Sequence, residues 1–126
     1  MDKYKDIVSR LIEQHRLLQK NLLEVDFNSF SKNLSDHLYL ENDVFYPELI
    51  IRMKAKQMDV SSTVQFIDEM KAIGVTVQAF LKKYQDISEE QKQSPNFKKE
   101  LDDIISVLNL RIESEESGVY GYWSEI

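Results

Sequence analysis

Residues 4–25 read YKDIVSRLIEQHRLLQKNLLEV, and apolar side chains in this stretch recur at every third or fourth position. That spacing places one apolar stripe along the side of an α-helix. The stripe consists of Tyr4, Val8, Leu11, His15, Leu18, Leu22 and Val25. One member, His15, is polar. The stretch therefore predicts an amphipathic helix that carries a histidine on its buried face.

Three further stretches, residues 27–45, 63–87 and 97–122, show the same spacing, and none alternates as a β-strand does. Their stripes are Phe27, Phe30, Leu34, His37, Glu41 and Val44 or Phe45; Thr63, Phe66, Met70, Ile73, Val77, Phe80, Tyr84 and Ile87; and Phe97, Leu101, Ile104, Leu108, Arg111, Glu115, Val119 and Tyr122. Short connections make consecutive helices antiparallel. We therefore predict an all-α fold, an up-down-up-down antiparallel four-helix bundle, formed by a single domain over residues 1–126.

Helix-start residues agree with this division. Asp26 is suited to cap the second helix, Ser61 or Ser62 the third, and Ser94, followed by Pro95, the fourth. Pro47 removes a backbone donor, so we expect the second helix to kink or end near residues 43–45.

Composition excludes several classes of function. The 126 residues include 16 Lys+Arg and 22 Asp+Glu, a formal net charge of −6, and no Cys. An acidic surface repels phosphate, so we expect no nucleic-acid partner and no membrane binding. The absence of cysteine and of a secretory signal favours a cytoplasmic location. We do not expect an enzyme, because no nucleophile motif or phosphate-binding loop is present.

Polar side chains interrupt the predicted stripes at matching heights. His15 and His37 each lie about eleven residues from the turn at Asp26, which corresponds to roughly 16 Å along each helix. Glu41 is one turn beyond His37, and Glu115 is one turn beyond Arg111. Buried charges of this kind are normally paired or bound to metal.

The two halves of the chain also resemble each other. IEQHRLL (12–18) aligns with IDEMKAI (67–73), and LSDHLYLENDVFY (34–46) aligns with LNLRIESEESGVY (108–120). In this alignment His15 corresponds to Met70, His37 to Arg111, Glu41 to Glu115 and Tyr46 to Tyr120. A repeated helical hairpin with polar residues facing inward is typical of metal sites in bundle cores.

With these motifs, the chain resembles the hemerythrin-like (HHE) domain family over nearly its whole length. The resemblance rests on the histidine in IEQHRLL, on His37-x-x-x-Glu41 followed by FYPEL, and on RIESEES. It implies an oxygen-binding or sensing diiron centre. In that comparison His15 and His37 match terminal ligands of one iron, and Glu41 and Glu115 match the bridging carboxylates, with Glu116 as the alternative to Glu115.

The chain departs from the family where the second iron would be held, because Met70 and Arg111 stand in place of histidines. Thioether and guanidinium do not replace imidazole on iron. One interpretation is therefore a single ion held by His15, His37, Glu41 and Glu115. These donors suit Fe(II), Mn(II) and Zn(II) alike; iron is our preferred ion, with dioxygen as a candidate ligand of the site. We also hypothesise that Arg111 compensates the two carboxylates in place of a second metal.

The other interpretation is a metal-free bundle that acts by binding a protein partner. The run from Arg111 to Glu116 is similar to that of the regulator-of-sigma-D family, whose members are four-helix bundles. In this case the polar residues form a buried network. In either case we expect the aromatic tail GVYGYW (118–123) to pack against the end of the bundle.

Overall fold

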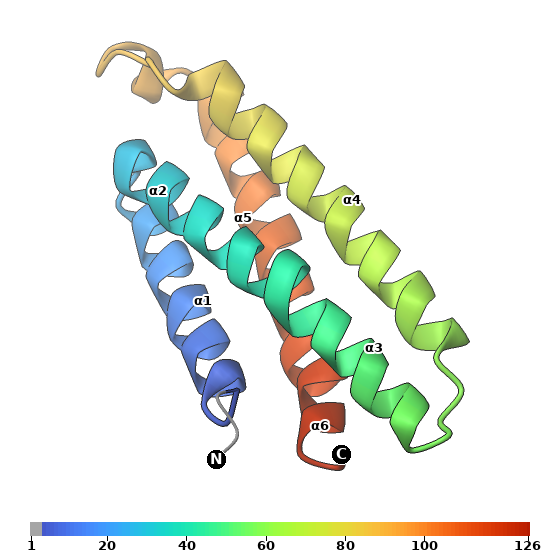
Figure 1. Ribbon diagram of the computed structural model, residues 1–126. Coiled ribbons are helices and arrows are strands. Elements are labelled where there is room, and N and C mark those ends of the chain that lie inside the picture. Colours follow the sequence, from blue (N-terminus) through green and yellow to red (C-terminus); the bar gives the residue numbers. More distant parts are fainter. Residues whose placement is uncertain (1–3) are drawn as a thin grey trace.

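The computed structural model describes residues 4–126, and every regular element within that range is a helix (Figure 1). The elements in chain order are α1 (Ile7–Leu23), α2 (Phe27–Leu38), the π-helix η1 (Tyr39–Phe45), α3 (Tyr46–Ala55), α4 (Ser61–Tyr84), the short 3₁₀-helix η2 (Gln91–Gln93), α5 (Pro95–Ser117) and α6 (Val119–Trp123). Helix α1 packs on α2 and α5, and α4 packs on α2, α3 and α5. The all-helical bundle confirms the predicted all-α class.

Two predicted helix starts are confirmed and one is wrong. The Asp26 carboxylate accepts from the Ser29 backbone N–H at the start of α2, and the Ser94 hydroxyl accepts from the Phe97 N–H at the start of α5. Neither Ser61 nor Ser62 caps α4. Instead, the Asp59 carboxylate accepts from the Ser61 N–H, so Ser61 already lies inside the first turn.

The second predicted helix changes from α-helix to π-helix close to residues 43–45, where the sequence predicted a kink or an end. Helix α2 continues directly into the π-helix η1, which ends at Phe45. Pro47 then lies in the first turn of α3. Helix α3 itself was not predicted, and it extends the same run across the bundle (Figure 1).

Apolar side chains form two separate clusters. The first core consists of Leu18, Leu22, Phe27, Phe30, Leu34, Val77, Phe80, Leu81, Phe97, Ile104, Leu108 and Ile112. The second core consists of Ile7, Leu11, Leu40, Phe45, Tyr46, Leu49, Met53, Ile67, Val119 and Tyr120. Tyr120 and, in part, Trp123 of the aromatic tail pack as expected, whereas Tyr122 is exposed. Along the chain, His15, His37 and Glu115 each lie between a residue of one core and a residue of the other. Within the described range, no helix has the length and apolar composition that a membrane crossing needs.

The buried face of α4 differs slightly from the predicted stripe. Ile67 and Gly74 are buried, whereas Phe66 and Ile73 of the predicted stripe are only partly buried. Burial of a glycine on this face leaves room for a side chain from a neighbouring helix, and that side chain belongs to the polar layer described next.

Candidate metal centre

The structure brings together the four residues that the sequence proposed as metal ligands. His15 comes from α1, His37 from α2, Glu41 from η1 and Glu115 from α5, and each is at most 2% exposed. One ligand atom from each lies within 4.8 Å of the others. Glu115 belongs to this group, whereas Glu116 contacts the outer nitrogen of His15.

Both imidazoles are held from outside so that their Nε2 atoms face the carboxylates. His15 Nδ1 lies 2.8 Å from Glu116 Oε2, and His37 Nδ1 lies 2.7 Å from Gln14 Oε1. Because these oxygens are acceptors, each Nδ1 carries a proton, and in a neutral imidazole the Nε2 atom then keeps its lone pair. Metal-binding histidines are typically oriented by such outer partners.

The two Nε2 atoms have few partners of their own. His37 Nε2 is buried with no hydrogen bond and lies 3.4 Å from Glu41 Oε2. His15 Nε2 lies 3.6 Å from Glu115 Oε2, and burial lowers the pKa of this imidazole. A buried acceptor without a donor costs free energy. A metal ion at this position would satisfy both lone pairs.

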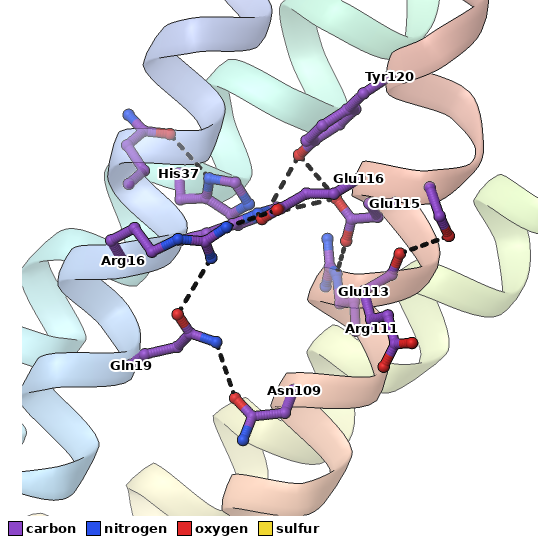
Figure 2. Close-up of polar contacts among 12 residues, drawn as sticks. Arg16, Gln19, His37, Asn109, Arg111, Glu113, Glu115, Glu116 and Tyr120 are labelled. Carbon is purple, nitrogen blue, oxygen red and sulfur yellow. Dashed lines mark hydrogen bonds and ion pairs between the residues drawn. The ribbon is translucent and has the colours of Figure 1, made fainter.

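The Oε1 atoms of the two carboxylates face away from the histidines and accept hydrogen bonds from an arginine. Arg111, itself 3% exposed, donates from Nη2 to Glu41 Oε1 and from Nε to Glu115 Oε1, each at 2.5 Å. Figure 2 shows this guanidinium beside Glu115 on α5. The predicted ion pair between Arg111 and Glu115 is therefore present, and it extends to a second carboxylate.

Two tyrosines complete the site, and neither was among the candidate site residues predicted from the sequence. The Tyr120 hydroxyl lies 2.5 Å from Glu41 Oε2, 2.9 Å from Glu115 Oε2 and 3.2 Å from His15 Nε2. The Tyr46 hydroxyl donates to Glu41 Oε1 at 3.0 Å. Each tyrosine stands five residues after a glutamate of the cluster. The internal repeat, which pairs Tyr46 with Tyr120, was the signal that could have found them.

Burial and charge divide the carboxyl groups into two kinds. Burial raises the pKa of Glu115 well above its usual range, and the charge of Glu41 adds to this effect. Burial opposes ionisation of Glu41 as well, but its close approach to Glu115 and His37 and the charge of Arg111 bring its pKa well below the usual range. Without metal, Arg111 is the positive charge that faces both of these buried carboxyl groups.

Glu116 supports the site from its rim. One oxygen of its carboxylate, Oε2, accepts from His15 Nδ1, and the other, Oε1, accepts from Arg16 Nη2 at 2.6 Å. Arg16 in turn donates to Gln19 (Figure 2). Met70, which aligns with His15 in the repeat, is buried on α4 and offers no ligand atom of the kind found in this group.

A comparison with family models now identifies the class of protein. The model described as the hemerythrin HHE cation binding domain matches residues 5–123, and the chain belongs to this family. Neither the curated proteins nor the solved structures compared with the chain give a match.

Proposed function

We propose that this protein binds one metal ion, iron, through His15, His37, Glu41 and Glu115. The observation that carries the proposal is the orientation of the imidazoles. Both donate Nδ1–H outward, and His37 Nε2 is left buried without a hydrogen bond beside a carboxylate. Membership of a cation-binding family supports the same conclusion.

The donor set agrees with iron. Two imidazole nitrogens and two carboxylate oxygens suit Fe(II), and they also suit Mn(II) and Zn(II). The proposed role is binding or sensing of iron or dioxygen rather than catalysis. An iron ion held here would supply the redox chemistry, and the chain supplies a dry, oriented set of donors.

Metal content per chain tests this proposal first. The protein is purified anaerobically without chelator or affinity nickel, reconstituted with Fe(II), and analysed for metals. We expect about one iron per chain in the wild type and a large loss in His37→Ala, which removes one of the four donor groups.

Asn33→Ala is the matched control. Asn33 lies on α2 one turn before His37 and donates to Asn21 of α1, so its removal breaks a contact between the same two helices without touching the cluster. It should retain the metal. Equal loss in both variants would mean that the site responds to helix packing and not to the imidazole. Two irons in the wild type would contradict a single site.

Dioxygen is tested separately on the iron-loaded protein. Mixing with oxygenated buffer should change the near-ultraviolet absorbance, and His37→Ala treated in the same way should show only the Tyr and Trp bands. An unchanged spectrum in the loaded wild type would remove dioxygen from the proposal and leave iron binding in place.

A second candidate function has one observation in its favour. Arg111, Tyr46 and Tyr120 already satisfy the oxygens of both carboxylates by hydrogen bonds. Such a network suits a metal-free module that acts on a protein partner. Failure to take up iron, manganese or zinc after reconstitution would favour this function over metal binding.

A further inference from the structure

We propose that Arg111 is a built-in second cation of the metal centre, which restricts the site to one ion and keeps the bundle folded when that ion is absent. The restriction to one ion rests on the proposed function. The stabilisation of the metal-free bundle does not depend on it.

Each carboxylate of the cluster has two distinct sides. The Oε1 atoms of Glu41 and Glu115 both accept from Arg111, at 2.5 Å each. Their Oε2 atoms face the histidines, at 3.4 Å from His37 Nε2 and 3.6 Å from His15 Nε2. Both carboxylates thus lie between the guanidinium, which contacts their Oε1 atoms, and the two imidazoles, which face their Oε2 atoms. A metal ion bound to the imidazoles would share both carboxylates with Arg111.

The fold makes room for this guanidinium at one position. A Cβ atom added at Gly74 would lie 2.8 Å from Arg111 Nη1, which is inside the normal contact distance. The other two guanidinium nitrogens, Nε and Nη2, are fixed by the carboxylates, so the group has little freedom to move away. The absent side chain on α4 therefore permits Arg111 to stand between Glu41 and Glu115.

Charge explains why a cation is needed there. Glu41 and Glu115 are fully buried and contribute oxygens to one small volume. Buried carboxylates without a cation are strongly unfavourable, and removal of one member of a buried ion pair is costly because the partner charge remains. A guanidinium cannot lose its proton in a protein and does not dissociate. The carboxylates are consequently held in place before any metal arrives.

The stability test compares Arg111→Met with Arg10→Met. Both remove one positive charge, but Arg10 is exposed on α1. In chelator-treated protein, we expect Arg111→Met to lower Tm by about 10–20 °C, and Arg10→Met to change it little. Saturating Zn²⁺ should then raise the Tm of Arg111→Met by more than it raises that of the wild type, because metal can replace the missing cation.

An arginine with only a packing role would give a different result. The Tm loss would then be the same with and without Zn²⁺, and this outcome would overturn the proposal. If Arg111→Met does not fold without metal, recovery of the folded state on addition of Zn²⁺ supports the proposal. If it folds in neither condition, the stoichiometry measurement below decides.

Stoichiometry is measured by Zn²⁺ titration of Arg111→Lys and Arg111→His. Lysine keeps a positive charge beside the carboxylates, so we expect about one ion per chain, as in the wild type. Histidine removes the fixed charge and offers an imidazole beside the two freed Oε1 atoms, so we expect about two. About one ion in both variants would contradict the role of Arg111 as a second cation.

The same titration separates this inference from the proposed function. If the wild type binds no ion and Arg111→His does, the metal function fails and the role of Arg111 stands. If the wild type binds one ion and neither its stoichiometry nor its metal-free Tm responds to substitution of Arg111, the metal function stands and this inference fails.

Discussion

The Tyr120 hydroxyl has one proton and three acceptors within reach, namely two carboxylate oxygens and His15 Nε2. Tyr120→Phe removes this hydroxyl while keeping the ring that packs against His15 and Phe45. We expect the chelator-treated variant to lose about 2–3 kcal/mol in urea unfolding, because a buried charged oxygen of Glu41 is left without its donor.

Two other tyrosines serve as controls for that measurement. Tyr46→Phe should cost less, about 1 kcal/mol, because Glu41 Oε1 still accepts from Arg111. Tyr122→Phe, two residues from Tyr120 and 39% exposed, should leave stability unchanged. Equal losses at Tyr120 and Tyr122 would show that the hydroxyl of Tyr120 contributes nothing to the buried layer.

Single residues explain how much of the site could be predicted from the sequence. His15, His37, Glu41 and Glu115 break apolar stripes, and a polar residue on an apolar face is visible in a sequence. Tyr120 lies beside the predicted stripe of its helix and not on it. An aromatic ring also suits an apolar core, so periodicity gives no sign of its hydroxyl. Its contact with Glu41 joins residues that are 79 positions apart, and only the packing of the helices brings them together.

At the scale of the element, helix α4 should be unusually intolerant of alanine at Gly74. Gly→Ala within a helix normally stabilises by about 0.5–1 kcal/mol. At Gly74 the new Cβ would meet Arg111 Nη1 at 2.8 Å. We expect Gly74→Ala to destabilise the protein by about 1–3 kcal/mol instead, as overpacking does elsewhere, and urea unfolding measures this directly.

Gly121→Ala in α6 is the matched control, since its Cβ would meet nothing within 4 Å. It should be neutral or slightly stabilising. If Gly74→Ala were equally harmless, the guanidinium would have room to shift, and Gly74 would not be needed for its position.

Elements differ in how far local sequence determines them. The starts of α2 and α5 follow from Asp26 and Ser94, whose side chains reach a nearby backbone N–H. The π-helix between α2 and α3 does not follow from any local preference, because its wider turn satisfies a tertiary requirement. It carries Glu41 into the polar layer while Leu40 and Phe45 enter the second core. Sequence pattern indicated a disturbance near residues 43–45 but not its form.

At the scale of the whole molecule, Phe30 and Phe45, one from each apolar core, differ in their contact with the polar layer. Phe30 of the first core and Phe45 of the second are both 0% exposed. The Phe45 ring packs edge-on against Tyr120, with centroids 5.3 Å apart at 89°. Phe30 has no ring contact with the residues of the layer among the described stacking pairs. Phe45 therefore helps to position Tyr120 as well as stabilising the fold.

Phe30→Leu and Phe45→Leu should separate these two effects. Each keeps an apolar side chain but loses volume in a fully packed core, so we expect both to lower the free energy of unfolding by a similar amount, about 1–2 kcal/mol. Zn²⁺ affinity, measured by titration calorimetry at a temperature where both variants are folded, should stay unchanged in Phe30→Leu. In Phe45→Leu it should fall about tenfold, as happens when an outer support of a metal site is disturbed. Equal affinities in the two variants would mean that the layer depends on the stability of the whole bundle and not on the second core, because global destabilisation acts on both alike.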